Sequence, residues 1–149
     1  MRHVTVSRTV PQPPEEVFDF LDVIANHERI TDHYMTDWSF SGPDRGVGSR
    51  CACTVTLGGR SSRAEIETKD AERPRRIVEE NESDAGRRKG RGTYALEPAP
   101  GGGTVVSFTF AVREAPLADR LAAPIAPRII AKANVRVLER LEQELARGS

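Results

Sequence analysis

The residues best suited to acid–base chemistry lie between positions 27 and 34. His27 and His33 flank Glu28 and Asp32, and Tyr34 follows directly. An imidazole titrates near neutral pH and binds metals, so the cluster invites a general-base or a metal-site interpretation. Two histidines six residues apart do not share one face of a helix, which favours a solvated helix end. His33 with Tyr34 at the mouth of a cavity is then the best acid–base candidate.

Glutamates of the central segment are the second group of ionisable candidates. Glu65 and Glu67 look like a catalytic pair, but the strand pairing derived below directs both toward basic side chains on the outer face. Glu79, Glu80 and Glu82 lie at one predicted strand, where successive side chains alternate between faces, so all three cannot point inward. A carboxyl that faces a cavity has its pKa raised by burial unless it is paired. The sequence leaves open which glutamate that is.

The two cysteines, Cys51 and Cys53, are expected to be small buried residues in a reducing compartment. At positions i and i+2 of a strand their side chains point the same way about 6.5 to 7 Å apart, an awkward separation for a disulfide. Two thiols also fall short of the roughly four ligands of a zinc site. The Gly46-Val47-Gly48 segment is no dinucleotide fingerprint, since no helix follows it. We therefore expect no metal, no cofactor and a cytoplasmic location.

Length and charge narrow the class of partner. The 149 residues are expected to form one ligand-binding domain, residues 1–149, because a chain of this length buries a sufficient core. The 22 basic and 22 acidic side chains cancel, which gives no reason to expect a nucleic acid or an anionic membrane as partner. No apolar stretch approaches the ~18 residues of a membrane span, so membrane insertion is not expected. We expect a small hydrophobic partner and a monomer or homodimer.

A basic cluster of Arg87, Arg88, Lys89 and Arg91 lies among glycines. Contact with a phosphate or RNA is one interpretation. A lone basic run without stacking aromatic residues is more typical of a solvated loop, which we expect over residues 84–92.

Hydrophobic periodicity predicts the elements that position these residues. Alternation of period two predicts strands at 3–10, from 35 to 40, at 76–81, at 93–97 and at 104–112. Pro13 and Pro14 begin a short helix that breaks near Asp22 and continues to residue 30. A period of 3.6 predicts a long helix within residues 116–147, kinked at Pro124 and Pro127 or beginning after them.

The Gly58-Gly59 pair predicts a two-residue turn and fixes the register of one hairpin. If Leu57 faces Arg60, small and apolar side chains share one face, and Arg50, Thr54, Arg63, Glu65 and Glu67 share the other. A second hairpin places Tyr94 and Leu96 on the side of Phe108 and Phe110. Both hairpins therefore have an apolar face that needs cover.

The order of strand, two short helices, about six further antiparallel strands and one long helix predicts an α+β fold, in which a curved sheet wraps around the last helix. With particular residues, this order resembles the START-like (SRPBCC) superfamily of helix-grip proteins, which includes pollen allergens and polyketide cyclases. The resemblance covers nearly the whole chain. It rests on Pro13-Pro14-Glu15-Glu16-Val17-Phe18, Gly46-Val47-Gly48-Ser49, Gly58-Gly59, Pro74-Arg75-Arg76-Ile77-Val78, Gly101-Gly102-Gly103-Thr104-Val105-Val106 and Leu138-Glu139-Arg140-Leu141-Glu142.

The resemblance implies a cavity between the sheet and the C-terminal helix, and the derived inner face gives it named residues. The expected ligand-binding residues are Trp38, Cys51, Cys53, Val55, Ser62, Ala64, Ile66, Tyr94, Leu96, Phe108, Phe110, Ile125 and Ile129. Small residues opposite a helix also fit simple close packing, and the aromatic residues also fit an ordinary core. His33, Tyr34 and Tyr94 are the weak candidates for catalysis.

The function that this resemblance implies is binding of a polyketide, a lipid or a related hydrophobic molecule. As an enzyme, the protein would be a polyketide cyclase/dehydrase, in which the cavity folds a reactive chain and polar groups move protons. The alternatives are a non-catalytic carrier or sensor, and a cochaperone-like module that binds proteins. An enzyme needs a titratable group in the cavity, a carrier needs apolar lining, and an interaction module needs an exposed apolar patch.

Overall fold

The computed structural model describes residues 3–117 and 126–148. Its elements, in chain order, are β1 (His3–Val10), α1 (Pro14–Asp22), the short helix η1 (Ile24–Asn26), α2 (His27–Thr31), β2 (Met35–Ser41), β3 (Arg50–Leu57), β4 (Arg60–Glu72), β5 (Arg76–Ser83), β6 (Arg88–Pro98), the turn η2 (Pro100–Gly102), β7 (Thr104–Glu114) and α4 (Ala126–Arg147). The break of the first helix at Asp22 is confirmed, since α1 ends at that residue.

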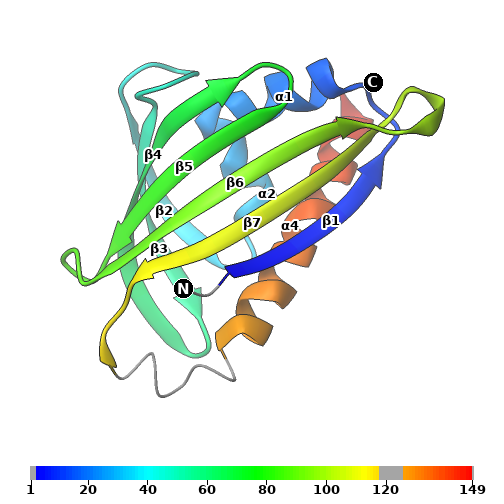
Figure 1. Cartoon of the computed structure of the whole chain (residues 1–149). Helices are drawn as coiled ribbons and strands as arrows, with labels where there is room; N and C mark the ends of the chain where they lie inside the picture. The colour runs from blue at the N-terminus through cyan, green and yellow to red at the C-terminus, as the bar shows by residue number, and fades with distance from the viewer. Residues whose placement is uncertain (1–2, 118–125, 149) are drawn as a thin grey trace.

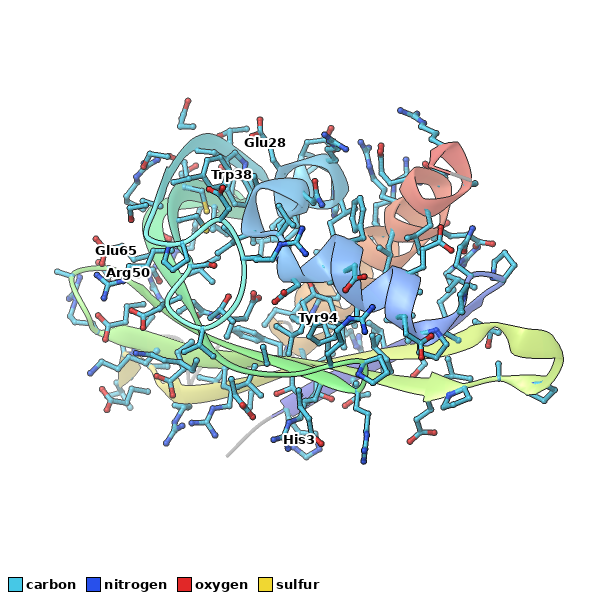
Figure 2. All side chains as sticks on the ribbon, turned by 90° about the horizontal axis from the view of Figure 1, so that it is seen from above. His3, Glu28, Trp38, Arg50, Glu65 and Tyr94 are labelled. Atoms are coloured by element: carbon cyan, nitrogen blue, oxygen red, sulfur yellow. The ribbon has the colours of Figure 1, made fainter. Side chains whose placement is uncertain are left out.

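One antiparallel sheet forms the body of the molecule. Its seven strands follow the order β1-β7-β6-β5-β4-β3-β2, so the first and second strands of the chain lie at opposite edges. The sheet curves, and α1, α2 and α4 all lie on its concave side (Figure 1). In the perpendicular view, Tyr94 points from the sheet toward the helices and His3 points away from them (Figure 2). This is the predicted α+β helix-grip fold.

The register derived from the Gly58-Gly59 turn is confirmed. Leu57 pairs with Arg60, Cys53 with Ala64 and Arg50 with Glu67. Both glycines have a positive φ, 59° and 78°, which the turn requires and side chains disfavour. The pairing puts the small apolar residues of β3 and β4 on the concave side and their charged residues outside.

Helix α4 buries the predicted apolar stripe against the sheet. Ala133, Val137, Leu141 and Leu145 are buried, and Ile130 is half-buried. The helix begins at Ala126, so Pro127 lies in its first turn, where a missing N–H costs no helical hydrogen bond. Pro124 and the rest of residues 118–125 lie outside the described residues.

Ion pairs hold the C-terminal half of α4 on both sides. Arg8 of β1 pairs with Glu142, and Arg140 donates to Asp32 at 2.8 Å. These contacts fix the helix between β1 and the end of α2.

Within the described part of the chain, no helix combines the length and the apolarity needed to cross a membrane.

The loop predicted over residues 84–92 was placed wrongly at its C-terminal end. Strand β6 already begins at Arg88, and Arg91 pairs across the sheet with Glu80 at 2.9 Å. Lys89 contacts Glu82 at 3.8 Å in the same way. Basic side chains alternate here with Gly90 and Gly92, and the two glycines suggested a loop although they lie in the strand.

Strand β2 is an edge strand with an interruption. Its pairing with β3 shifts between Thr36 and Ser39, and Asp37 between them has a φ of 55°. The Asp37 carbonyl accepts a hydrogen bond from Arg63 Nη1 at 2.6 Å. Trp38 and Phe40 stack with ring centroids 5.7 Å apart, as expected for residues on one face.

Candidate functional site

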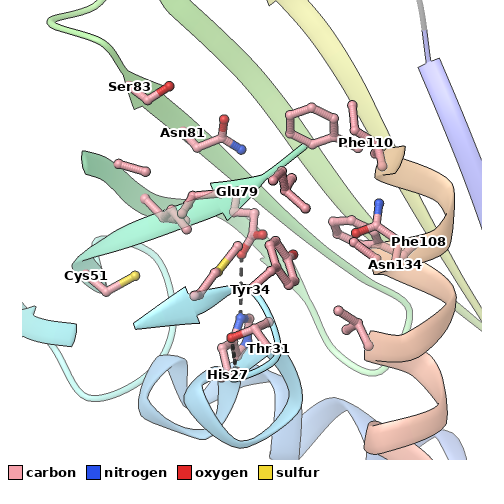
Figure 3. A pocket seen from close by; sticks show the side chains of 18 of the residues that line it. His27, Thr31, Tyr34, Cys51, Glu79, Asn81, Ser83, Phe108, Phe110 and Asn134 are labelled. Carbon is pink, nitrogen blue, oxygen red and sulfur yellow. Dashed lines mark hydrogen bonds and ion pairs between the residues drawn. The ribbon is translucent and has the colours of Figure 1, made fainter. Parts of the chain in front are cut away.

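A cavity of about 160 Å³ lies between the concave sheet and α4 (Figure 3). Strands β2 to β7 supply most of its wall, and α2, the turn after it and α4 supply the rest. Its lining residues are His27, Thr31, Tyr34, Met35, Trp38, Cys51, Val55, Leu57, Ser62, Ala64, Ile66, Glu79, Asn81, Ser83, Tyr94, Phe108, Phe110, Ile130, Ala133, Asn134 and Val137.

Most of the residues expected to bind a ligand lie in this wall. They are Trp38, Cys51, Val55, Ser62, Ala64, Ile66, Tyr94, Phe108 and Phe110. Tyr94 and Phe108 pair across β6 and β7, with ring centroids 4.5 Å apart. Together these residues give the cavity a mainly apolar and aromatic surface.

The other expected binding residues lie elsewhere. Cys53 packs with Ile24 in a satellite core, and Leu96 lies in the main core. Ile129 is half-buried and lies next to the Gly58 turn, where its Cδ1 would be 3.2 Å from a Cβ added to that glycine. Ile125 lies outside the described residues.

Two of the three catalytic candidates, Tyr34 and Tyr94, line the cavity, and His33 does not. The exposed His33 ring stacks obliquely on Tyr34, with centroids 4.8 Å apart. Its Nε2 lies 3.0 Å from the Ala133 carbonyl, to which it donates. The hydrogen-bonded part of the residue is partly shielded from water, and this desolvation lowers the pKa of His33 because it disfavours the imidazolium. This geometry ties the end of α2 to α4.

Glu79 is the glutamate that faces the cavity. Strand β5 directs Ile77, Glu79 and Asn81 inward, while Glu80 points outward to Arg91. Only 7% of Glu79 is exposed, and its Oε2 has no hydrogen-bond partner within the described residues. A carboxyl in this position is unusual, because a buried polar atom without a partner costs roughly 1 to 3 kcal/mol.

Two glycines make room for the polar side chains of β5. Gly92 pairs with Glu79, and Gly90 pairs with Asn81. A Cβ at Gly92 would lie 2.9 Å from Phe108 Cζ and 3.0 Å from Glu79 Oε1. The aromatic rings of β7 therefore lean over bare backbone, and the Glu79 carboxyl fits beside them.

His27 is buried beside Glu79, which corrects the expectation of a solvated helix end. Only 7% of His27 is exposed, because the break between α1 and α2 turns it toward the sheet. Its Nε2 lies 2.7 Å from the Leu21 carbonyl, which has no proton to give, so Nε2 is the donor. Nδ1 lies 3.8 Å from Glu79 Oε2, and Figure 3 shows the two side chains facing each other.

Burial governs the ionisation of the cavity wall. Desolvation raises the pKa of Glu79, and the charge of His27 opposes this shift. Desolvation and then the Glu79 charge raise the pKa of Tyr34 and Tyr94. Desolvation also raises the pKa of Cys51, the thiol that lines the cavity. The tyrosines and Cys51 are therefore neutral near pH 7, which leaves the Glu79–His27 pair as the acid–base candidate of the cavity.

The polar part of the lining was only partly anticipated from the sequence, which named Glu79 among three glutamates and left open which one faces inward. Asn81 and Ser83 on β5 and Asn134 on α4 join Glu79 and His27 in the wall. Period-two alternation from Ile77 was the available signal, since it puts Glu79 and Asn81 on the face of that apolar residue. Burial of His27 and Asn134 depends on packing between distant segments, which local patterns do not report.

Comparison with known proteins adds a family and a fold. A family described as "Polyketide cyclase / dehydrase and lipid transport" matches residues 1–146. No curated protein matches the chain. Protein TTHA0849 from Thermus thermophilus superposes with a TM-score of 0.77 at 20% identity, over 99% of both chains. Major latex-like protein 151 from Panax ginseng superposes with a TM-score of 0.73 at 12% identity, over 96% of both chains. At such identities the solved structures support the fold alone.

Proposed function

Because the chain belongs to the polyketide cyclase/dehydrase and lipid transport family, we propose that it binds a small hydrophobic molecule in the cavity between the sheet and α4. The family and the helix-grip fold support a role in hydrophobic-ligand binding. The single observation that carries the proposal is the apolar and aromatic wall of the cavity, to which Trp38, Phe108 and Phe110 contribute. Such a surface gains free energy when an apolar molecule leaves water and enters it.

The ligand class that we propose is a polyketide, a lipid or a related molecule without a strong charge. No lysine or arginine of the described residues lines the cavity. An anionic head group would therefore be desolvated without a counter-ion, which is costly in a low-dielectric site. We also keep a cytoplasmic location as part of the proposal, since the free thiols of Cys51 and Cys53 suit a reducing compartment.

The experiment uses the one tryptophan of the chain, Trp38, which lines the cavity. Titration with a panel of lipids and aromatic polyketides should change its fluorescence, and native mass spectrometry should detect one bound ligand per protein. A Phe110→Trp variant adds a second reporter on the opposite wall, and should respond to the same ligands. If no member of the panel binds in either measurement, the binding proposal is wrong.

A catalytic role is the second candidate, and the buried Glu79–His27 pair favours it. In a dehydration, the pair would take a proton from the carbon next to a carbonyl and return a proton to the departing hydroxyl. The products are a carbon–carbon double bond and water, so the step needs no oxidant. Glu79→Gln should abolish turnover of a β-hydroxy carbonyl substrate while retaining its binding. Retained turnover in the variant would show that Glu79 is not the catalytic group, and absence of turnover in the wild type would leave the carrier or sensor as the function.

A cochaperone-like interaction module fits the surface less well. The exposed large apolar side chains of the described residues are Phe40, Val47, Leu117 and Val135, and each lies on a different segment. An interaction module needs a contiguous apolar patch, which four scattered side chains do not provide.

A further inference from the structure

The Glu79–His27 pair at the buried end of the cavity has a fixed hydrogen-bonding polarity, and this polarity restricts the ligand further. The inference rests on the proposed function and deepens it. Residues on one side of the cavity, including Ser62, Asn81 and Ser83, are half-buried, whereas Thr31 and Glu79 on the other are buried. A ligand that enters at the half-buried rim therefore meets Glu79 last.

One hydrogen bond determines which nitrogen of His27 donates and which can accept a hydrogen bond from Glu79. His27 Nε2 donates to the Leu21 carbonyl at 2.7 Å, so in the neutral imidazole Nδ1 is an acceptor. Nδ1 faces Glu79 Oε2 at 3.8 Å, and Oε2 has no other partner within the described residues. A shift of about 1 Å would bring the two atoms to the ~2.8 Å of a charge-assisted or neutral hydrogen bond.

Because an unpaired carboxylate is costly at this depth, one proton is assigned to the contact between Oε2 and Nδ1, held by either atom. If the carboxyl holds it, Glu79 and His27 are both neutral; if the imidazole holds it, their charges cancel. In both states the second oxygen, Glu79 Oε1, has no proton and can only accept. This oxygen lies on the Gly92 side, 3.0 Å from the position of an added Cβ. The pair thus offers the cavity an acceptor and no net charge.

We propose that the cavity recognises a neutral ligand that carries a hydroxyl group, and that this hydroxyl donates to Glu79 Oε1 at the buried end. A carbonyl group has no proton to donate there, and a carboxylate is repelled. An ammonium can donate, but the pair has no net charge to neutralise it in a desolvated site. Glu79 is in this role a ligand-binding residue.

The volume of the cavity limits the size of the apolar group that such a ligand can place beside Glu79. A dry cavity of about 150 Å³ in another protein accommodates benzene, and the volume here is about 160 Å³. The space around Phe108 and Tyr94 therefore holds one six-membered ring. Benzyl alcohol, toluene, benzaldehyde and benzylamine share this ring and differ only in the group that Glu79 meets.

Isothermal titration calorimetry with these four compounds tests the proposal on the wild-type protein and three variants. We expect benzyl alcohol to bind on the order of 10-fold more tightly than toluene or benzaldehyde, because one buried hydrogen bond is gained. Glu79→Leu should reverse the order of benzyl alcohol and toluene. Glu79→Gln should keep the wild-type order, since its amide can donate to His27 and present its carbonyl to the ligand. Glu80→Leu makes the same change one residue along, on the outer face, and should leave the affinities for the four compounds unchanged.

Three results would overturn the proposal. They are equal or tighter binding of benzaldehyde or benzylamine, an unchanged order in Glu79→Leu, and no binding of any one-ring compound. Each of these leaves the binding function intact if the lipid and polyketide panel still binds. Failure of both panels contradicts the binding function itself, so the two claims are separable. If Glu79→Leu does not fold, the order of the four compounds on the wild-type and Glu79→Gln proteins still decides.

Discussion

Replacing the buried carboxyl of Glu79 with an amide should change how stability depends on pH. Burial raises the pKa of Glu79 above its ordinary value of 4.5, and the charge of His27 opposes the shift only in part. The unfolded chain therefore gives up this proton at a lower pH than the folded protein. Stability is fully present below about pH 4.5 and is lost as the pH rises through the folded-state pKa.

The size of the effect has an upper limit. Each pH unit over which the folded protein keeps the proton costs about 1.36 kcal/mol. Between about pH 5 and 7.5, the titration of this single proton can therefore change the stability by at most ~3.4 kcal/mol. Ion pairing with His27 reduces this cost. Glu79→Gln removes the titration, and so should gain stability relative to the wild type as the pH rises from about 5 to 7.5.

Urea denaturation at several pH values, followed by far-ultraviolet circular dichroism, measures this difference. Glu80→Gln is the matched control, because the same change one residue along has the opposite sign. A hydrogen bond from Arg91 lowers the pKa of Glu80, so its contribution is present above about pH 4.5 and is lost as the pH falls. Glu80→Gln should thus lose stability relative to the wild type at neutral pH. Parallel curves for Glu79→Gln and wild type would show that Glu79 is ionised and well solvated, contrary to the buried geometry.

Three further predictions concern packing. Leu141→Ala removes a fully buried side chain (0% exposed) from α4 and should cost about 2 to 5 kcal/mol in urea denaturation, whereas Val135→Ala, at 46% exposed on the same helix, should cost less than about 0.5 kcal/mol. Gly92→Ala places a Cβ 2.9 Å from Phe108 Cζ. It should therefore destabilise the protein by about 1 to 3 kcal/mol and weaken ligand binding in calorimetry. Unchanged binding would contradict the described position of Phe108 in the cavity wall. Cys53, with its pKa raised to about 11, should react with a thiol reagent at neutral pH only after denaturation, and rapid labelling of the native protein would contradict its burial.

The sheet could be predicted closely because its signals are local. The Gly58-Gly59 turn leaves one register for β3 and β4, and alternation of period two then assigns every side chain to a face. The C-terminal helix was equally clear, since a 3.6-residue apolar stripe has few other uses. The main error in the strands came from Gly90 and Gly92, whose type suggests a loop. Their role in the strand appears only when the rings of the neighbouring strand are in position.

The polar end of the cavity could not be predicted in the same way. A register shift in β4 between Thr68 and Asp70 breaks the alternation that would carry the inner face from Ile66 to β5. On β5 itself, alternation from Ile77 turns Glu79 inward and alternation from the adjacent Val78 turns Glu80 inward, so the pattern alone does not choose between them. The burial of His27 depends on the angle between two short helices, which no periodic pattern encodes. The apolar wall was therefore found from sequence, and its acid–base pair was found from the structure.

The interruption in β2 bears on how the protein avoids aggregation. A sheet with free edges can recruit another chain through its unpaired backbone groups, and β2 forms one such edge. At Asp37 the backbone leaves the strand conformation, its carbonyl is occupied by Arg63, and an exposed charge stands at the rim. A second molecule that paired with β2 would meet a break in the regular ladder at this residue. The same edge strand that carries Trp38 into the cavity is thus a poor template for edge-to-edge pairing with the sheet of another molecule.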